Sequence, residues 1–437
     1  KAGKTIAKSP LASDIKNVIV HTPYIGGGFG AKDHTQFPYY GILASLFAKA
    51  PVYLANDRFE QFQSGLKRHP FVMANKLAFD KNTKKIAGLV SDMEVDGGGR
   101  INFSGSVTMV GASAIQGIYY IPRNDITAVC YPSQTPHAGS MRGYGTLQSM
   151  SAMEMMFNEA AAELDVDPIE LRKINALKPG LKNTQGALPN GDMRYLEMLE
   201  MAAKHPKWVN RHSAKAEFEA KHPGKLYGVG FGMVSKDYGT GAAAPSSSVE
   251  ITPEGKIIVK TCSVEMGTGI DTSQGSLVSQ YLGSAADEIE MAVTEEFDAM
   301  ELFATDNPYL ISQERQDQML KDPRWTPAVS MASAASMSSF YQTQTTENAA
   351  RILLEKTLFP AAVEIWKNTY FNGQFATPDF NDVSKARWSN DGLTINGYPP
   401  ISLELLAKKA HADGMITGVM THAFNRWAWA SAEFELE

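Results

Sequence analysis

Cysteine is scarce in this sequence of 437 residues, since only Cys130 and Cys262 occur. Two cysteines so far apart cannot build a disulfide framework, a cysteine-ligated zinc site or an iron–sulfur cluster within the chain. Any iron–sulfur centre that works with this protein must therefore come from a partner.

Long apolar runs and basic clusters are also absent. No run approaches the ~20 apolar residues of a transmembrane helix, and the first residues, Lys1 to Lys4, are not followed by the apolar core of a signal peptide. A net charge of −6 without a Lys/Arg run argues against nucleic acid or an anionic membrane as the main partner. A cytoplasmic protein is expected, with a periplasmic location left open.

What is present is the composition of an ordinary folded protein, 43% hydrophobic and 20% charged. A chain of this length exceeds one small hydrophobic core, so two or three domains are expected. The sequence becomes polar and basic between residues 204 and 225, and Pro206 and Pro223 lie near the two ends of this stretch. We therefore predict a first domain over residues 1–205, a connection over 206–225 and a second domain over 226–437.

Hydrophobic periodicity and turn residues predict a mixture of helices and paired strands. In the first half we expect helices near residues 35–48, 147–164 and 169–177, an antiparallel hairpin of strands 71–80 and 85–95, and a strand over 126–131. In the second half we expect strands over 227–234, 247–252 and 257–262, a helix ending near Gly283 and an amphipathic helix over 345–356. The predicted fold class is α+β.

Four segments of small residues each precede a predicted helix: residues 26–33, 140–145, 265–269 and 333–338. Helix N-termini present N–H groups and positive potential, which suit an anionic cofactor held by backbone. Each segment alone is better explained as a tight turn. Because all four share small residues and a position before a helix, we expect that together they surround one large ligand.

The first segment also fits the dinucleotide-binding fingerprint, with Gly26, Gly28 and Ala31 at the required spacing. Asp57 follows a strand-like run over residues 51–56, where a ribose-binding acid is expected. An NAD-dependent dehydrogenase built on the Gly26–Ala31 loop is therefore an alternative. It does not explain the other three segments, and the antiparallel hairpin that follows is not how a dinucleotide domain continues.

The motifs of these segments, in order, are Gly26–Lys32 (GGGFGAK), Met141–Gly145 (MRGYG), Glu265–Gly269 (EMGTG) and Ser333–Ser336 (SAAS). With Arg68–Phe71 and Asp167–Asn175, they resemble the molybdenum-binding large subunit of the xanthine dehydrogenase/aldehyde oxidase family. The resemblance implies two large mixed α/β domains enclosing a molybdopterin cofactor, with its cytosine dinucleotide form left open. It also implies hydroxylation of an aldehyde or N-heterocycle with water as the oxygen source, and electron transfer to iron–sulfur and FAD domains or subunits.

The resemblance further assigns residues to the cofactor. Molybdenum is held by the pterin and not by protein side chains, and it is expected near Phe29, Arg142 and Ala335. Thr268 stands where the family usually has Gln. The full set of expected cofactor-binding residues is Gly28, Phe29, Gly30, Arg142, Gly267, Thr268, Gly269, Ala334, Ala335, Ser336 and Ser338.

Three residues are expected in the substrate pocket by the same resemblance. Asp33 stands where purine-hydroxylating members carry an acid, Val110 stands about where they carry Arg, and Tyr144 replaces a common Phe. The acid of the purine-hydroxylating members is kept as Asp33, whereas their arginine is replaced by Val110. An aldehyde or another N-heterocycle is therefore at least as strongly indicated as a purine. Asp33 is equally well explained as an acid in the first turn of a helix.

No catalytic residue can be assigned, because the family's general-base glutamate lies in a motif expected beyond Glu437. The first domain is likewise expected to lack its N-terminal part. The chain therefore resembles an internal fragment or one part of a split subunit. A non-catalytic cofactor-binding subunit stays open as a second alternative.

Overall fold

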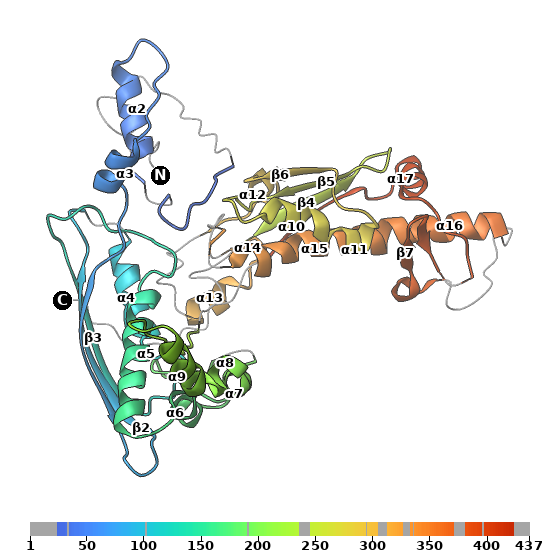
Figure 1. Ribbon diagram of the computed structural model, residues 1–437. Helices are drawn as coiled ribbons and strands as arrows, with labels where there is room; N and C mark the ends of the chain where they lie inside the picture. The colour runs from blue at the N-terminus through green and yellow to red at the C-terminus, as the bar shows by residue number, and fades with distance from the viewer. Residues whose placement is uncertain are drawn as a thin grey trace. The chain divides into compact units, whose positions relative to one another are not determined.

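The computed structural model describes residues 24–32, 35–100, 103–189, 192–235, 245–293, 295–304, 313–326, 333–334, 336–370, 381–395 and 397–423. The chain divides into two compact units (Figure 1). Unit 1 comprises Lys1–Val20, Phe29–Lys236 and Ala430–Glu437; unit 2 comprises His21–Gly28 and Asp237–Trp429. The domain boundaries predicted at residues 206–225 stay a prediction.

Unit 1 contains a three-stranded sheet in the order β1–β2–β3. Strands β1 (Phe71–Phe79) and β2 (Ile86–Asp96) are antiparallel, as the sequence predicts, and β3 (Asn124–Tyr131) runs parallel to β2. Residues of β2 alternate between buried and exposed positions, so one face of the sheet carries the core.

Helices α4 (Ser104–Ala114) and α5 (Thr146–Glu163) lie along this sheet in Figure 1. The helix predicted near residues 147–164 is confirmed as α5, and Met150, Met153 and Phe157 form a buried stripe along it at helical spacing. The other helices of unit 1 are α2 (Phe37–Phe47), α3 (Arg58–Ser64), α6 (Pro168–Asn175), α7 (Tyr195–Lys204), α8 (Pro206–Val209) and α9 (Arg211–Lys221).

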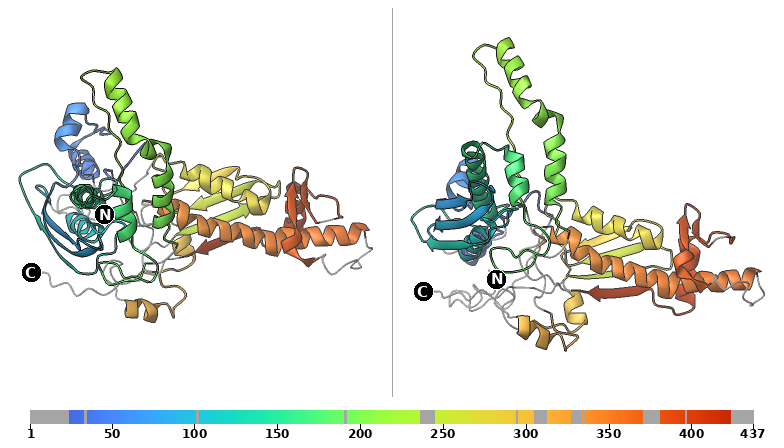
Figure 2. Two further views of the ribbon diagram at one scale, coloured as in Figure 1. Left: turned by 60° about the horizontal axis from the view of Figure 1, so that its bottom comes forward. Right: turned by 90° about the horizontal axis from the view of Figure 1, so that it is seen from below.

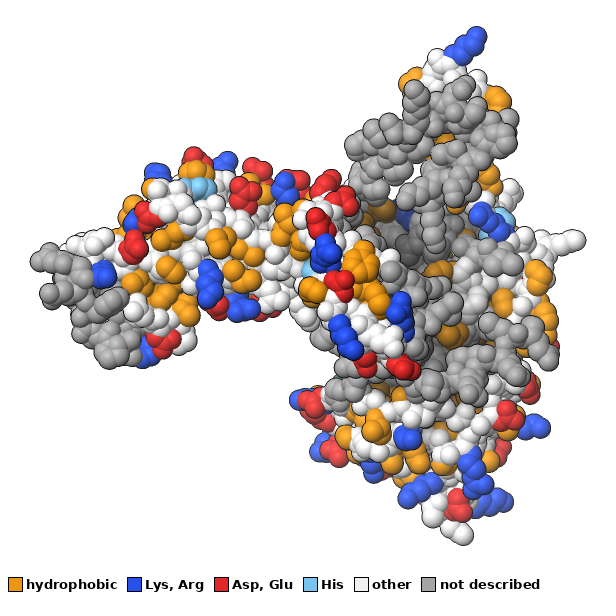
Figure 3. All heavy atoms as spheres, turned by 180° about the vertical axis from the view of Figure 1, so that it is seen from behind, with side chains coloured by type: hydrophobic (Ala, Val, Ile, Leu, Met, Phe, Trp, Pro, Cys, Tyr) orange, Lys and Arg blue, Asp and Glu red, His pale blue; other side chains and the backbone are white. Residues whose placement is uncertain are grey.

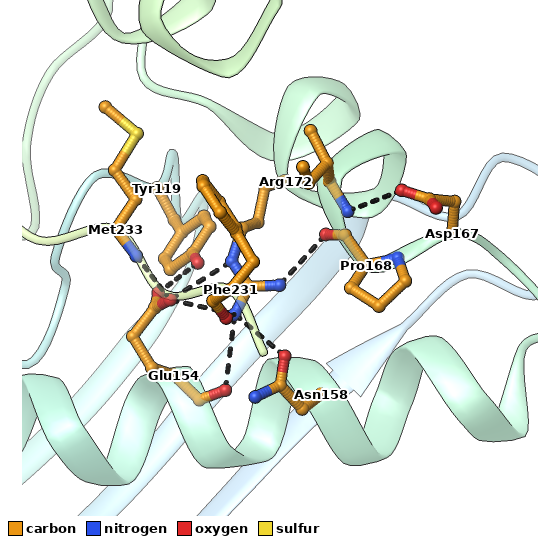
Figure 4. Close-up of polar contacts among 9 residues, drawn as sticks. Tyr119, Glu154, Asn158, Asp167, Pro168, Arg172, Phe231 and Met233 are labelled. Atoms are coloured by element: carbon orange, nitrogen blue, oxygen red, sulfur yellow. Dashed lines mark hydrogen bonds and ion pairs between the residues drawn. The ribbon is translucent and has the colours of Figure 1, made fainter. Parts of the chain in front are cut away.

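A buried ion pair joins α5 to α6 inside unit 1 (Figure 4). The guanidinium of Arg172, whose side chain is fully buried, donates to Glu154 Oε2 at 2.8 Å and to Asn158 Oδ1 at 3.0 Å. The Tyr119 hydroxyl donates to the other oxygen of Glu154. Buried charges need such partners, and these side chains supply them.

The strand predicted over residues 227–234 is wrong, because this segment is irregular in unit 1. Its backbone is bonded to side chains instead of to a neighbouring strand. Met233 N–H donates to Glu154 Oε2 at 2.8 Å, and Phe231 C=O accepts from Arg172 at 3.5 Å. The apolar residues that suggested a strand are therefore held against helices.

Unit 2 contains a four-stranded sheet in the order β6–β5–β4–β9. Strands β4 (Ser246–Ile251) and β5 (Ile257–Thr261) confirm the strands predicted at 247–252 and 257–262. They form an antiparallel hairpin, and Gly255 in its turn has φ +82°. Strand β9 (Gly418–His422) pairs antiparallel with β4, and β6 (Glu288–Met291) pairs parallel with β5.

Helix α15 (Gln342–Leu353) lies alongside this sheet (Figure 2) and contacts β4 and β9. It confirms the predicted amphipathic helix and continues through a π-helical turn, Leu354–Leu358, into α16 (Phe359–Tyr370). The remaining elements are α10 (Ile270–Leu277), α11 (Ser279–Leu282), α12 (Glu295–Ala299), α13 (Gln313–Met319), α14 (Met337–Phe340), a 3-10 turn (Val383–Lys385), β7 (Arg387–Ser389), β8 (Gly392–Thr394) and α17 (Leu403–Ala412).

The mixture of sheets and helices confirms the predicted α+β class. Within the described ranges, no helix has the length and apolar content needed to cross a membrane. On the face shown in Figure 3, acidic and basic side chains are interspersed with hydrophobic ones.

Candidate cofactor site

The loop before α10 is folded around one buried carboxylate. Glu265, only 6% exposed, accepts hydrogen bonds from five successive backbone N–H groups, those of residues 267–271, at 2.5–3.3 Å. Burial by itself raises the pKa of Glu265, but the N–H donors outweigh burial, so the pKa lies below its usual range. The positive N-terminus of α10 is thus already neutralised by a side chain of the same loop.

Glycines allow this loop to close on the carboxylate. Gly267 has φ +93° and Gly269 has φ +73°, a region that side-chain-bearing residues rarely adopt. Thr268 between them is exposed, so its side chain lies on the outer surface of the loop while its N–H donates to Glu265.

The first glycine loop begins in unit 2, paired with the loop of Glu265. Ile25 N–H donates to Glu265 C=O at 3.3 Å, and Gly27 N–H donates to Met266 C=O at 3.0 Å. The contact is so close that a Cβ on Gly267 would lie 2.8 Å from Gly27 N. Gly28 differs, because a Cβ there would meet no atom of the described residues within 4 Å.

A buried network of hydroxyl and amide groups connects the fourth segment to this loop. Val264 N–H donates to Ser333 Oγ at 2.7 Å, and the Ser333 hydroxyl donates to Gln342 Oε1 at 3.0 Å. The Ser263 hydroxyl donates to the same Gln342 oxygen at 2.8 Å. All three side chains are buried, so the network fixes the segment that leads into α14.

The expected cofactor residues of the fourth segment lie directly before or within α14. Ser336 is exposed, has φ +63° and is the N-cap of α14, whereas Ser338 is buried. Ala334 C=O accepts from Met337 N–H at 3.0 Å. Ala335 lies outside the described residues.

In unit 1 the continuation of the first loop contacts the second loop. Arg142 N–H donates to Phe29 C=O at 2.8 Å. Gly30 has φ +86°, and a Cβ there would lie 2.8 Å from Ser140 C=O, so only glycine fits without a shift. Phe29 is 61% exposed and Arg142 is also exposed, so both residues are accessible to solvent.

The Arg68 side chain stabilises the backbone of the second loop. Its guanidinium donates to the backbone carbonyls of Arg142 at 2.8 Å and Gly143 at 3.5 Å. Burial lowers the pKa of Arg68, although an arginine stays charged at neutral pH. A fixed cation therefore holds the backbone from which Arg142 projects.

The expected substrate-pocket residues that are described lie in adjacent parts of unit 1. Val110 is a half-buried residue of α4, and Tyr144 is half-buried directly before α5. The two elements meet closely, since a Cβ on Gly145 would lie 2.5 Å from Gly111 N. Asp33 lies outside the described residues.

The acid required by the dinucleotide alternative has a structural role here. Asp57 is the N-cap of α3: its side chain accepts from Glu60 N–H at 2.8 Å, and the Glu60 carboxylate accepts from Asp57 N–H at 2.8 Å. Residues 51–56, predicted to be strand-like, form no strand. Asp57 is thus explained without a ribose.

Three supporting residues were missed by reasoning from the sequence. The role of Glu265 could have been predicted from its motif. An acidic residue just before Gly-x-Gly at the start of a helix can itself be the anion that the backbone N–H groups bind. Gln342 had a weaker signal, as it shares a helical face with Thr345 and Thr346. Arg68 had none beyond its place in a family-like motif, since its partners are more than 70 residues away.

These contacts fit a ligand held by backbone and hydroxyl groups. The described ranges contain no group of three or more His, Cys, Asp or Glu side chains able to hold a metal ion. The resemblance implies that molybdenum is held by the pterin and not by protein side chains.

Comparison with known proteins gives the same assignment. Models of the molybdopterin cofactor-binding domain match residues 3–176 and 201–301. The chain is 28% identical over 290 residues to the putative xanthine dehydrogenase molybdenum-binding subunit of Escherichia coli (strain K12), covering 64% of this chain and 37% of that protein. It is 31% identical over 259 residues to the aldehyde oxidoreductase of Megalodesulfovibrio gigas, covering 58% and 27% respectively.

The fold agrees with solved structures. Quinoline 2-oxidoreductase from Pseudomonas putida 86 superimposes with a TM-score of 0.68 and 21% identity, covering 92% of this chain and 48% of that one. The chain spans less than half the length of these relatives. Together the domain matches, the relatives and the shared fold show that the chain belongs to the molybdenum hydroxylase family, which includes the xanthine dehydrogenases and aldehyde oxidoreductases.

Proposed function

We propose that this chain is the molybdopterin-binding part of an enzyme that hydroxylates an aldehyde or an N-heterocycle. The observation that carries the proposal is that three of the four loops, residues 26–32, 141–145 and 265–269, lie inside the regions matched by molybdopterin cofactor-binding domains. The NAD-dependent dehydrogenase and the non-catalytic subunit are not favoured by these comparisons.

When bound, the cofactor supplies the two-electron oxidation of a substrate C–H bond, with the new oxygen taken from water. The two protons go to solvent, and the two electrons leave to iron–sulfur and FAD groups on partner domains or subunits. The cytosine dinucleotide form of the pterin and a cytoplasmic location belong to the same proposal.

The chain's own residues would hold the cofactor mainly through small groups. Gly28 lets a flat ligand approach the backbone, and Thr268 and Ser336 offer exposed hydroxyl groups. The set proposed from the resemblance also includes Gly267, Gly269, Ala334, Ala335 and Ser338.

Phe29 and Arg142 are the residues proposed to face the reacting end of the cofactor. The exposed Phe29 ring can stack on a planar substrate, and the Arg142 guanidinium can donate to a carbonyl or ring nitrogen. Val110 and Tyr144, with Asp33, are proposed to shape the substrate pocket. A hydrocarbon at Val110 in place of a cation favours substrates with fewer anionic groups than a purine dione.

The test is elemental and pterin analysis of the protein purified with its natural partner chains, followed by turnover in ¹⁸O-labelled water. We expect stoichiometric molybdenum, a released pterin, and ¹⁸O in the product from an aldehyde or N-heterocycle. Bound NAD without molybdenum or pterin would overturn the proposal. Molybdenum and pterin without turnover on either substrate class would support the non-catalytic alternative.

Gly28→Ala tests the placement of the cofactor. In the part of the chain that the structure describes, its Cβ would meet no atom within 4 Å, and its φ is not positive. We therefore expect the free energy of unfolding to be unchanged while molybdenum content falls. Gly228→Ala is the matched control, because Gly228 is equally open but distant in sequence from the four loops. Equal molybdenum content in both variants would remove Gly28 from the site.

A further inference from the structure

We propose that Glu265 is a positioning residue that sets the shape of both glycine loops of unit 2 and so the surface they present to the cofactor. The inference rests on the proposed function and adds to it a residue that does not contact the cofactor itself. The geometry of one carboxylate and its five N–H donors carries it.

The contacts divide between the two carboxylate oxygens. Oε1 accepts from residues 267, 268 and 269, and Oε2 accepts from residues 270 and 271. The same residue's backbone carbonyl accepts from Ile25 N–H. Glu265 thus links the start of α10, the Gly267–Gly269 turn and the first glycine loop.

This arrangement decides which groups of the loop a ligand can meet. The N–H groups at the start of α10 point inward to Glu265 and are not available to a phosphate. The outer surface carries the exposed Gly267 and Thr268. We therefore infer that the cofactor meets the Thr268 side chain and the bare faces of the glycines, and that its phosphate lies elsewhere.

A neutral amide cannot replace the carboxylate. In Glu265→Gln one acceptor oxygen becomes an NH₂ group, which would face N–H donors and leave them unsatisfied in a buried site. In Glu265→Asp the side chain is one methylene shorter, so it cannot span both sets of donors. Glu265→Ala removes the anion and leaves a pocket that a small carboxylate can fill.

The experiment compares these three variants with Glu250→Gln, a control at an exposed glutamate of β4. Each is purified as the full enzyme with its partner chains. Hydrogen exchange of the peptide containing residues 265–271 reports the local bonds, and molybdenum and pterin content per folded protein reports cofactor retention. In Glu265→Gln we expect hydrogen exchange to be at least ~10-fold faster. We also expect molybdenum retention to be about 10-fold weaker, an effect of the size found for residues that orient the groups of a metal site without binding the metal.

Chemical rescue separates positioning from a general loss of stability. Acetate should restore slow exchange and cofactor retention in Glu265→Ala with a saturable dependence, whereas the isosteric neutral acetamide should not. Faster exchange with unchanged molybdenum content would overturn the positioning role. Loss of molybdenum with no acetate rescue would also overturn it. A wild-type enzyme without molybdenum or pterin would overturn the proposed function itself, and the positioning role with it.

Discussion

Replacing Arg172 by methionine should be among the most damaging single substitutions in unit 1. The guanidinium is fully buried and donates to Glu154, Asn158 and the Pro168 carbonyl. Methionine fills much of the same volume but donates nothing. Among the described residues, Glu154 would keep the donors from Tyr119 and the Met233 backbone but would lose its cation.

The size of the effect follows from the uncompensated charge. Removing one partner of a buried ion pair costs about 3–5 kcal/mol, whereas replacing both partners by apolar groups is often far less costly. For a unit of this size, that loss corresponds to a fall in Tm of about 6–20 °C. Glu154→Met combined with Arg172→Met should recover at least ~1 kcal/mol, although Tyr119 and the Met233 N–H lose their acceptor.

Hydrogen exchange of the complete protein provides the assay, read in the peptides containing α5, α6 and residues 227–235. A loss of 3–5 kcal/mol should speed their exchange by roughly 100-fold to several thousand-fold. Lys221→Met is the control, because Lys221 pairs with Glu217 at 2.6 Å on the surface, where both side chains are about two thirds exposed; its effect should stay below ~0.5 kcal/mol. If Arg172→Met changed the exchange no more than this control, the reasoning would be refuted.

Three further predictions concern a glycine, a helix cap and pH. Gly30→Ala should destabilise unit 1 by about 1–3 kcal/mol in denaturant unfolding, because φ is +86° and the new Cβ would lie 2.8 Å from Ser140 C=O; a loss below ~0.5 kcal/mol would contradict this. Asp167→Ala should cost ~1 kcal/mol or slightly more, since it removes both the N-cap of α6 and the ion pair with Arg211, and Asp167→Asn should recover the cap alone. Because the pKa of Glu265 is lowered on folding, its stabilisation is complete above the unfolded pKa of about 4.3 and is lost as pH falls through the lower folded value. Unfolding measured from pH 5 to 3 should thus depend less on pH in Glu265→Gln than in wild type, and equal slopes would refute it.

Local sequence signals predicted much of the fold. The hairpin of β1 and β2 and the stripe of α5 depend on periodicity and on turn residues within a few positions. The helix predicted near residues 169–177 is observed as α6, and its N-cap Asp167 accepts from Ile169 N–H at 2.8 Å. The positions of the four loops before helices followed in the same way.

Failures occurred where the deciding partner is distant in sequence. Residues 227–234 have a strand-like composition, but Met233 and Phe231 bond to Glu154 and Arg172, which lie more than 55 residues earlier. The support that Arg68 gives to the second loop likewise spans more than 70 residues. No periodicity reports such contacts, so they were not predictable without the three-dimensional structure.

The glycines of the four loops separate into two groups once their surroundings are known. Gly267 and Gly30 have positive φ and lie so close to neighbouring backbone that the fold itself requires them. Gly28 has neither property: its φ is ordinary, and a side chain there would extend into open space. Gly228 is equally open, so openness alone does not identify a ligand site. What distinguishes Gly28 is its place in one of the four loops, where we propose that a ligand approaches the backbone closely. A loss of molybdenum in Gly28→Ala that Gly228→Ala does not share would therefore separate close approach of a cofactor from an open position in the chain.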